Sequence, residues 1–459
     1  MSEDTKLDEF VEAESGSSER ETEDLARKTV CGIPPQDWTV ARLGELVRVV
    51  SGNSLPTEYQ NGKEGDHPVY KVSDMNATGN QKYVSDTSNR LLKEDLEEIN
   101  HTLYPEGTTI LPKVGAALLT NKRRLLTESS SFDNNVMGWV PDEINPEFLY
   151  YVSCMIDMEA VAQKGAVPSI SKAIAKSLKV PSPPLPEQRN IATVLYTVDR
   201  AIEKTEEVIE QYKSLKSGIL EDLLREGVND HDQTERNIGP LTWNMPSSWS
   251  VKPIGELAEL VHGHQFRTGD FSEDGKIPVL KIGQITASGI DFSGADCISE
   301  QELDKYKNYT IEGGSPLIAL SGATWGKTGY FESYARPVLQ NYRVGKVVTD
   351  GSKLDKRYLY YIMESSIFQK QLRGQVVRQA QENIGKSDFE RIRIPIPQIS
   401  EQERISSIMS DIEKCIQSEN RSKRDLKSLK RGFMQDLLSG TVRTTDTNIE
   451  VPDEIAQHG

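Results

Sequence analysis

The stretch PLPEQRNIATVLYTVDRAIE, residues 184–203, has a counterpart near the end of the chain, PQISEQERISSIMSDIEKCI, residues 397–416. The Glu187-Gln188 pair of the first stretch returns as Glu401-Gln402, 214 residues later. In both stretches a proline stop and then Glu-Gln precede a long run in which apolar residues recur at steps of three and four. This punctuation predicts the same long amphipathic helix twice, once in the middle of the chain and once near its end.

The apolar residues of each predicted helix follow one stripe. The first stripe contains Ile191, Leu195, Val198, Ile202, Ile209, Tyr212, Leu215, Ile219 and Leu223, and the second contains Ile405, Met409, Ile412, Ile416, Leu426, Leu429, Phe433 and Leu437. Such spacing over five turns or more is typical of a coiled-coil seam. About 39 residues at ~1.5 Å each give a rod of ~58 Å, too long for one small domain to cover. We therefore expect the two helices to pair antiparallel, with a seam interrupted at Thr205, Glu419 and Lys423.

The segments before the helices repeat as well. PQDWTVARLGELVRVVSG at residues 35–52 returns as PSSWSVKPIGELAELVHG at residues 246–263, which aligns Trp38 with Trp249 at an offset of 211. Further matches are HPVYKV with IPVLKI, FLYYV with YLYYI, and SISKAIAKSLKVPSP with NIGKSDFERIRIPIP. Short strand patterns broken by glycine and proline, with one short helical stretch, predict a mixed α/β domain of roughly 150 residues in each copy.

The predicted fold class is α+β, with two pseudo-twofold-related mixed α/β domains joined by two long antiparallel coiled-coil helices. The chain divides accordingly into seven parts. They are a disordered acidic tail (1–30), a first domain (31–183), a central spacer helix (184–227), a linker (228–243), a second domain (244–397), a C-terminal spacer helix (398–440) and a flexible tail (441–459).

The charge of the chain is concentrated at its ends. The 459 residues carry a net charge of −16, and residues 1–25 hold ten acidic and two basic residues, a net charge of −8. A near-balanced body remains able to carry local basic patches. No run of 18 apolar residues and no signal-like N-terminus is present, which predicts a cytoplasmic protein. The four cysteines have no paired spacing that would indicate a zinc site or a disulfide framework.

Two motifs come close to catalytic signatures. SGATWGKTG at residues 321–329 is similar to a phosphate-binding P-loop, but Ser321 replaces the first glycine and the other copy has KVGAALLTNK at this place. NPEF at residues 145–148 differs from the motif of amino methyltransferases at Glu147, and a turn that leads into a helix explains it better. The six histidines have no metal-ligand spacing. The residues therefore predict neither an active site nor a metal site.

What remains is polar and cationic material on glycine-rich loops. Asn and Gln side chains pair with adenine, Arg and Lys with guanine, and any cation attracts backbone phosphates. Recurrence at matching places in both copies favours a DNA-binding role over isolated surface groups. The candidate residues are Lys71, Lys113, Lys122, Arg123, Asn134, Asn135, Lys281, Ser321, Thr324, Lys327, Gln340, Asn341, Arg343 and Arg378.

With two domains, two helices and the LPEQ and ISEQE openings, the chain resembles the specificity subunit of type I restriction-modification systems over about residues 33–440. Further landmarks of the resemblance are Trp38 and Trp249, the two Gly-Glu-Leu triplets, SGATWGK and LQNYRV. Ser400 departs from the proline that usually precedes Glu-Gln, and the acidic tail is a second departure.

The resemblance implies that each domain is a target recognition domain that reads one half of a split DNA site, and that the helices measure the distance between the halves. It also implies that the chain is not an enzyme by itself and binds no cofactor. Two methyltransferase subunits would bring S-adenosylmethionine and methylate adenine, and two motor-endonuclease subunits would bring ATP, Mg²⁺ and cleavage.

Two other functions stay open at this point. The first is a P-loop ATPase built on SGATWGKTG, and the second is a coiled-coil scaffold whose domains bind protein only. Neither the half-site sequences nor the spacer length can be read from the residues.

Overall fold

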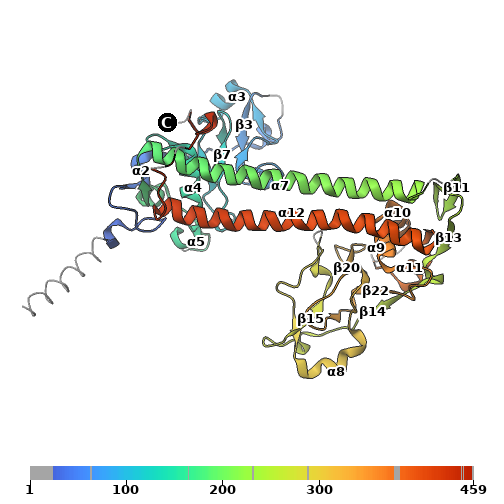
Figure 1. Ribbon diagram of the computed structural model, residues 1–459. Coiled ribbons are helices and arrows are strands. Elements are labelled where there is room, and N and C mark those ends of the chain that lie inside the picture. The colour runs from blue at the N-terminus through green and yellow to red at the C-terminus, as the bar shows by residue number, and fades with distance from the viewer. Residues whose placement is uncertain are drawn as a thin grey trace, which may run out of the picture. The chain divides into compact units, whose positions relative to one another are not determined.

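The computed structural model describes residues 24–62, 65–163, 165–229, 232–286, 289–376, 383–445, 447 and 449–456. The chain forms two compact units, unit 1 from residues 1–203 with 424–459 and unit 2 from residues 204–423. Each unit consists of one mixed α/β domain and of the stretches of two long helices that pack on it (Figure 1).

The domain of unit 1 is built from short strands and helices. Its strands are β1 (Thr39–Arg42), β2 (Val47–Ser51), β3 (His67–Tyr70), β4 (Tyr83–Val84), β5 (Arg90–Leu91), β6 (Thr109–Pro112), β7 (Arg124–Leu126), β8 (Ser131–Phe132), β9 (Val136–Pro141) and β10 (Lys179–Ser182). Its α-helices are α2 (Leu43–Leu46), α3 (Lys93–Glu98), α4 (Pro146–Cys154), α5 (Met158–Val161) and α6 (Lys172–Ser177).

The domain of unit 2 follows the same plan. Its strands are β11 (Gln233–Ile238), β12 (Leu241–Pro246), β13 (Ser250–Pro253), β14 (Ala258–His262), β15 (Ile277–Leu280), β16 (Ile285–Thr286), β17 (Gly289–Ile290), β18 (Cys297–Ile298), β19 (Ser315–Ala319), β20 (Thr328–Phe331), β21 (Leu339–Gln340), β22 (Val344–Thr349) and β23 (Arg393–Ile396). Its α-helices are α8 (Leu303–Tyr306), α9 (Lys356–Glu364), α10 (Ser366–Val376) and α11 (Lys386–Glu390).

Sheet topology confirms the repeat. The main sheet has the order β2-β9-β6-β7-β4 in unit 1 and β14-β22-β19-β20 in unit 2. A smaller sheet has the order β5-β3-β8 in one unit and β18-β15-β21 in the other, with one antiparallel and one parallel pair each time. The predicted fold class, two like mixed α/β domains and two long helices, is therefore confirmed.

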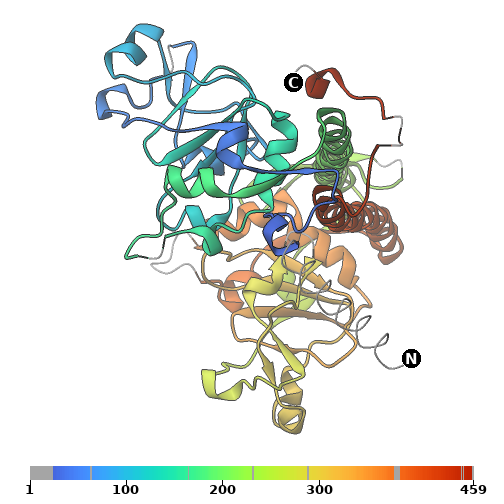
Figure 2. The same cartoon turned by 90° about the vertical axis from the view of Figure 1, so that its left-hand side faces the viewer.

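The two long helices are α7 (Leu185–Glu226, 42 residues) and α12 (Ile399–Ser439, 41 residues). They lie side by side in each unit, and Figure 2 shows them nearly end-on in unit 1. Two contacts in each unit fix their direction. In unit 1 Lys430 contacts Asp199 at 2.5 Å, and Arg443, just after α12, contacts Glu187 at 2.8 Å. In unit 2 Lys216 contacts Glu413 at 2.6 Å and Lys423 contacts Glu206 at 3.6 Å. Within each unit the residue numbers rise along one helix while they fall along the other, so the pairing is antiparallel.

The buried seam differs from the predicted stripe in the C-terminal half of α7. Ile191, Leu195 and Ile202 are buried as predicted. Beyond Ile209 the buried apolar residues are Leu220 and Leu224, whereas Leu215 is 49% exposed. Ile219 and Leu223 of the predicted stripe are partly buried and pack against the core that contains Leu220 and Leu224, so the buried face is wider here than the predicted stripe and leaves out Leu215.

One joint attaches each domain to the start of a long helix. In unit 1 the Trp38 indole N–H donates to a Glu187 carboxylate oxygen at 2.9 Å, and in unit 2 Trp249 donates to Glu401 at 3.0 Å. All four side chains are at least 94% buried. The Glu of each Glu-Gln pair therefore holds the tryptophan that opens the domain.

The Gln of each pair reaches a different part of the domain. The Gln188 amide oxygen accepts from the Asn145 backbone N–H at 2.9 Å, and the Gln402 oxygen accepts from that of Asp355 at 2.8 Å. Asn145 and Asp355 are the N-cap residues of α4 and α9. NPEF is thus an N-cap followed by proline in the first turn, as the sequence indicates.

Buried charges complete both joints with different residues. In unit 1 Lys82, 7% exposed, contacts Glu147 at 2.6 Å, and its ammonium lies over the rings of Tyr83, Tyr150, Tyr151 and Tyr196. In unit 2 the position of Glu147 is taken by Arg357, which contacts Glu413 at 3.8 Å. Lys82 also contacts Asp199 of α7 at 3.6 Å, so each domain brings one cation to an acidic residue of a long helix.

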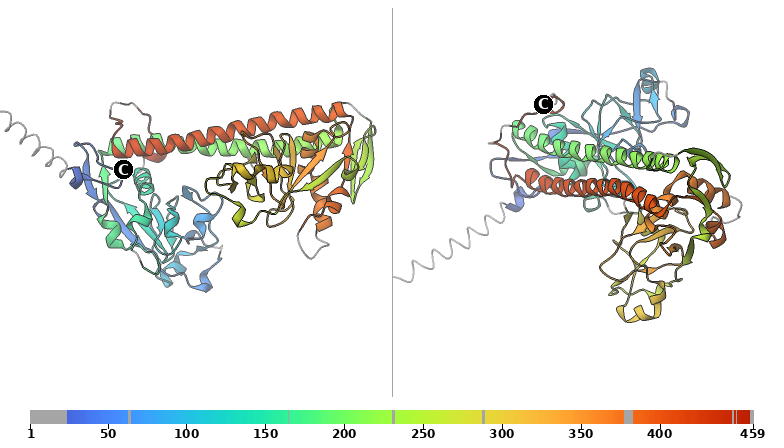
Figure 3. Two further views of the ribbon diagram at one scale, coloured as in Figure 1. Left: turned by 90° about the horizontal axis from the view of Figure 1, so that it is seen from below. Right: turned by 45° about the vertical axis from the view of Figure 1, so that its right-hand side comes forward.

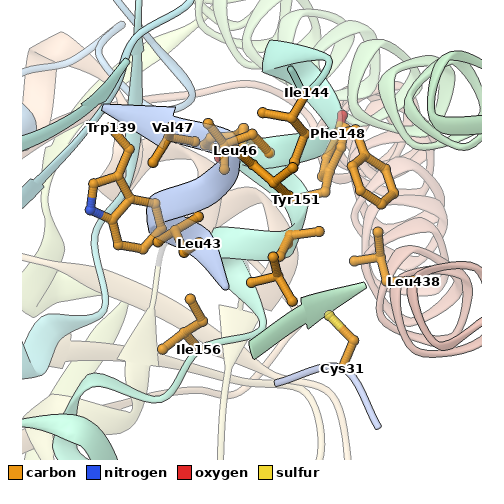
Figure 4. Close-up of a cluster of buried hydrophobic side chains, with 14 of the residues drawn as sticks. Cys31, Leu43, Leu46, Val47, Trp139, Ile144, Phe148, Tyr151, Ile156 and Leu438 are labelled. Carbon is orange, nitrogen blue, oxygen red and sulfur yellow. The ribbon is translucent and has the colours of Figure 1, made fainter. Parts of the chain in front are cut away.

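The core of unit 1 joins the domain to both helices. Figure 4 shows Phe148 and Tyr151 of α4 beside Leu438 of α12, with Trp139, Leu43 and Cys31 in the same cluster. The core of unit 2 likewise contains Leu224, Ile405 and Met409 together with Trp249 and Tyr358. Burial of these side chains at ~25 cal/mol per Å² ties each helix end to its own domain.

Three segments predicted as a linker or as tails make defined contacts where they are described. The linker (228–243) contains β11 and the start of β12, which pair as a hairpin, and it buries Trp243. In the predicted tail (441–459), Arg443 bonds Glu187 at 2.8 Å and Ile455 is fully buried. In the predicted tail 1–30, residues 1–23 lie outside the described residues, while Arg27 donates to the Pro35 carbonyl.

Among the described residues, no helix is long and apolar enough to cross a membrane.

We expect Trp249→Phe to lower the free energy of unfolding by about 1–3 kcal/mol, because a buried Glu401 oxygen loses its indole donor. Urea unfolding of the full chain measures this difference. Trp325→Phe, at a half-exposed tryptophan of the same unit, is the control and should cost clearly less. Equal costs for the two substitutions would contradict the role given to the indole hydrogen bond.

The Glu187 joint predicts a pH dependence. Burial by itself raises the pKa of this carboxyl, but hydrogen bonds from Arg443, Trp38 and the Thr444 backbone outweigh it, so the pKa lies below its usual value. The resulting stability is complete above the unfolded pKa of about 4.3 and is lost as the pH falls through the folded pKa.

In urea unfolding between about pH 6 and pH 3, the stability difference between wild type and Glu187→Gln should therefore shrink as the pH falls. The exposed Glu97→Gln serves as the control and should show no such trend. If the stability difference between wild type and Glu187→Gln stayed constant with pH, the negative charge of Glu187 would not be what stabilises the joint.

Candidate nucleic-acid interface

In unit 1 several loops meet at one turn. Gly52, directly after β2, lies so close to the strand β8 that a Cβ would come within 1.8 Å of the Phe132 carbonyl oxygen, which only glycine permits. The next residue, Asn53, forms a bridge with Asp133. The Asp133 N–H in turn donates to the Tyr70 carbonyl at 2.9 Å, which brings the residue after β3, Lys71, to the same place.

The turn at this meeting point is held by a buried carboxylate. Asp133 is 6% exposed and accepts from the Asn135 backbone N–H at 3.0 Å and from its side-chain amide at 3.3 Å. Burial raises the pKa of Asp133, while the Asn135 hydrogen bonds and nearby Lys71 act in the opposite direction. Asn134 and Asn135 are exposed at the tip of the turn.

Lysine residues surround this turn. The Lys71 ammonium donates to Gln60 at 3.0 Å, and the Lys113 backbone N–H donates to the Asn135 carbonyl at 2.9 Å. Burial lowers the pKa of Lys113, and neighbouring Lys172 lowers it further. The loop that begins at Lys71 also reaches Lys122, whose ammonium donates to Asn76. The structure thus brings Lys71, Lys113, Asn134 and Asn135 together. Lys122, from the segment before β7, contacts the loop that begins at Lys71 through Asn76.

Arg123 has a structural position instead. It is 2% exposed, and its guanidinium donates to the carbonyls of Ser153 at 3.2 Å and Ile156 at 2.7 Å, at the C-terminal end of α4. Burial lowers the pKa of this guanidinium, but the carbonyl acceptors satisfy its donors. The prediction that the Arg123 guanidinium contacts DNA is therefore wrong, because the group is buried and its donors are used inside the domain.

Unit 2 has the same turn with different residues at its tip. A Cβ on Gly263 would come within 2.2 Å of the Gln340 carbonyl, and His264 forms a bridge with Asn341. The buried Asn341 accepts from the Arg343 backbone N–H at 3.2 Å, as Asp133 does from Asn135. Tyr342 and Arg343 therefore take the places of Asn134 and Asn135, and the Arg343 side chain is exposed.

Gln340 is the second correction. It is 1% exposed, and its amide donates to the carbonyls of Val261 at 2.8 Å and Val344 at 2.7 Å, so it joins β14 to the strand β22. An amide whose two donors are used inside the sheet cannot at the same time read a base. Gln340 and Asn341 therefore hold the turn in place and are not exposed at its tip.

The remaining candidates of unit 2 lie in two places. Lys281 matches Lys71, forms an ion pair with Asp296 and lies 4.2 Å from the centre of the Phe271 ring. Ser321 forms a bridge with Asn383 in the loop after β19. Thr324 and Lys327 line a separate cavity of about 570 Å³. Arg378 lies outside the described residues.

The P-loop-like segment is a turn between two antiparallel strands, β19 and β20. Three of its backbone N–H groups are occupied, because Trp325 donates to Gly322 at 3.0 Å, Gly326 to Ala319 at 2.8 Å and Lys327 to Thr324 at 3.1 Å, and the strand β20 follows in place of a helix. A phosphate-binding loop needs free N–H groups at the start of a helix, so this geometry does not fit one. Within the described ranges there is also no group of three metal-ligating side chains.

Sequence reasoning missed several residues of these sites, namely Asn53, Asp133, Lys172, His264 and Tyr342. A signal for some of them existed, since Asn53 and His264 directly follow the matched glycines Gly52 and Gly263. Asp133 and Asn341 also align with each other when the two copies are compared, and Asp133 directly precedes the predicted residues Asn134 and Asn135. Their meeting depends on the strand order, which spacing alone does not give.

The two domains thus contain turns of the same construction with different exposed residues. Comparison with known proteins shows which family has such a repeated domain. Residues 35–211 and 246–428 match the model of the type I restriction modification DNA specificity domain. The chain belongs to this family. It is 25% identical over 420 residues to the type I restriction enzyme MjaVIII specificity subunit of Methanocaldococcus jannaschii, covering 90% of this chain and 95% of that one.

Other members of the specificity-domain family are similar over most of their length. The putative type I restriction enzyme MjaX specificity subunit of the same organism is 24% identical over 451 residues, covering 92% of this chain and 97% of that one. The crystal structure of the type I restriction-modification system S subunit from M. genitalium has a TM-score of 0.53 at 15% identity, covering 87% of this chain and 96% of that one. The latter likeness supports the fold.

We expect Gln340→Ala to lower the free energy of unfolding of this specificity-domain chain by about 1–3 kcal/mol, because two buried carbonyls lose their donor. Arg343→Ala, on the exposed tip of the same turn, should change it by less than about 0.5 kcal/mol. Urea unfolding of both variants tests this. A larger loss for Arg343→Ala than for Gln340→Ala would reverse the assignment of scaffold and surface.

Proposed function

We propose that this chain is the DNA-recognition subunit of a type I restriction-modification complex, in which each specificity domain reads one half of a bipartite double-stranded target. The observation that carries the proposal is the pair of turns at 133–135 and 341–343. Both are held by a buried side chain at their first residue and by a close glycine contact. Their outward residues differ, Asn-Asn in one domain and Tyr-Arg in the other.

The chemistry of these tips suits base reading. An exposed Asn amide matches the N7 and N6 groups of adenine, and an exposed Arg fork matches the N7 and O6 groups of guanine. Lys71, Lys113 and Lys172 around the first turn and Lys281 near the second are suited to phosphate contacts, which position the protein without reading sequence. A fixed scaffold with variable tips allows the two half-sites to differ.

The proposal assigns the catalytic steps to other chains. Two methyltransferase subunits with S-adenosylmethionine would methylate adenine, and two motor-endonuclease subunits with ATP and Mg²⁺ would cleave, all in the cytoplasm. The geometry of residues 321–329 supports this division, because the segment joins two antiparallel strands and does not lead into a helix, as a phosphate-binding loop does. The relatives that are named specificity subunits support it as well.

Mapping of methylated adenines in DNA exposed to the chain and its methyltransferase tests the proposal directly. We expect one bipartite sequence with a constant gap, and binding of that duplex that weakens steeply with salt because neutralised phosphates release counterions. Methylation at random sites, or equal affinity for target and scrambled duplex, would refute the reading function and favour a protein-binding scaffold.

Arg343→Ala should relax the sequence requirement in one half-site only, because a lost bidentate pair costs about 1–3 kcal/mol of discrimination. The matched variant Asn135→Ala should relax the other half-site. Methylation mapping with each variant reports both halves at once. If either substitution made both half-sites degenerate, the assignment of one half-site to each domain would fail.

A further inference from the structure

A third backbone segment lies beside the exposed turn of each domain. In unit 1 the Lys113 backbone N–H donates to the Asn135 carbonyl at 2.9 Å, and the Lys113 carbonyl accepts from the Ile170 N–H at 3.0 Å. Lys113 directly follows the strand β6. The segment that ends at Ile170 is therefore separated from the turn at 133–135 by a single backbone, to which both are hydrogen-bonded.

Unit 2 has the same arrangement. The Leu320 backbone N–H donates to the Arg343 carbonyl at 2.8 Å, and the Leu320 carbonyl accepts from the Ile384 N–H at 2.8 Å. Ile170 and Ile384 are each 3% exposed, so a buried isoleucine anchors the segment in both domains. The base of the segment is thus a shared feature of the two copies.

The residues directly before this base differ between the copies. The first copy has Val167-Pro168 where the second has Gln381-Glu382, three and two residues before the buried isoleucine. Residues 377–382 lie outside the described residues, so at this place the two copies are compared by sequence. The shared base does not require a valine, because the second copy has the same base without it. Val167 therefore varies in the way that the exposed residues of the two turns vary.

The Val167 side chain is 56% exposed on a segment whose backbone is held in place. The Gln163 N–H donates to the Ser169 carbonyl at 2.8 Å, and the Gly115 N–H donates to the Pro168 carbonyl at 2.8 Å. The long helices, which lie along one side of the domain in Figure 3, do not cover this side chain. Pro168 restricts the backbone of the residue before it, and a β-branched side chain is stiff at χ1. The structure thus presents two methyl groups in a fixed position.

Polar and cationic side chains surround this segment. Burial lowers the pKa of Lys113 and the nearby charge of Lys172 lowers it further, which places the two ammonium groups close together. Asn134 and Asn135 are exposed on the other side of the Lys113 backbone. The exposed valine therefore belongs to the same surface as the residues suited to phosphates and to base edges.

The spacing of the backbones places the valine within reach of the same half-site as the turn. Neighbouring hydrogen-bonded backbones lie about 4.8 Å apart, so two steps separate the Ile170 segment from the turn by about 10 Å. Successive bases of one strand are about 3.4 Å apart along the duplex, so this separation corresponds to about three base pairs. One short half-site is therefore long enough to meet both the turn and the valine.

We propose that Val167 contacts the C5-methyl group of a thymine in the half-site that the domain of unit 1 reads, and so selects thymine at that position. Thymine presents this methyl group in the major groove, where an apolar side chain is its suitable partner, and cytosine lacks it. The inference rests on the proposed function. It adds an apolar contact to the amide and phosphate contacts of the same domain.

Replacement of thymine by deoxyuridine tests this contact, because it removes only the C5-methyl group of the base. The complex of the full chain with its methyltransferase subunit is titrated with the target duplex that methylation mapping defines, and each thymine of the target is replaced in turn. We expect one replacement, in the half-site that Asn135→Ala relaxes, to weaken binding about three- to fivefold, the effect of one methyl group that is no longer buried.

Substitutions of the valine make the test specific. Val167→Ala should bind the thymine and deoxyuridine duplexes equally, and Val167→Ile should keep the preference for thymine. The exposed position predicts an unchanged midpoint of urea unfolding for Val167→Ala. The control Leu92→Ala, at a 47% exposed apolar residue of the same unit that directly follows β5, should keep the preference as well.

Two results would overturn the inference. The first is a wild-type complex whose binding no deoxyuridine replacement weakens, and the second is a Val167→Ala variant that keeps the preference of the wild type for thymine. Either result would leave the DNA-recognition function in place, provided that the target still binds more tightly than a scrambled duplex. Equal affinity for target and scrambled duplex would refute the proposed function, and this inference with it.

Discussion

The hydrogen bond between a buried indole and a buried carboxylate is the contact on which the rest of each unit depends. Trp38 with Glu187, and Trp249 with Glu401, join the residue before β1 or β13 to the first turn of a long helix that follows it by about 150 residues. A carboxylate at this depth is tolerable only where donors surround it. Arg443 and the Thr444 backbone provide them for Glu187, and the Val228 backbone provides one for Glu401.

This joint fixes the main sheet of each domain to the start of a long helix. The neighbouring Gln188 and Gln402 hold the N-cap residues of α4 and α9, and those helices pack in the cores that anchor the main sheets. The turns at 133–135 and 341–343 lie between β8 and β9 and between β21 and β22. Variation at Asn134, Asn135, Tyr342 and Arg343 therefore changes what is presented without changing the scaffold, because the backbone of the turn is held by Asp133 and Asn341.

The two units solve one electrostatic problem with different residues. The acidic residue of the long helix, Asp199 or Glu413, needs a cation from the domain. Lys82 supplies it in unit 1 and Arg357 in unit 2, although position 357 corresponds to Glu147. An alignment of the two copies places Glu147 where unit 2 has Arg357, which suggests a charge conflict. There is none, because Lys82 reaches the site from the loop before β4. Compensation of this kind is visible only when the strands are packed.

Spacing and repetition in the sequence determined the duplicated domain, the two long helices, the joint residues and the N-cap at NPEF, because these depend on local periodicity and on the comparison of one copy with the other. Only the tertiary structure decided which of the candidate polar residues are exposed and which are buried. Arg123 and Gln340 have the same chemistry as Arg343 and Asn135, yet strand pairing buries the first two against carbonyls and leaves the other two at the tip of a turn. It also decided that Leu220 and Leu224 of α7 are buried while Leu215 is exposed. Burial is set by which elements meet across distant parts of the chain, and local spacing carries no information about that meeting.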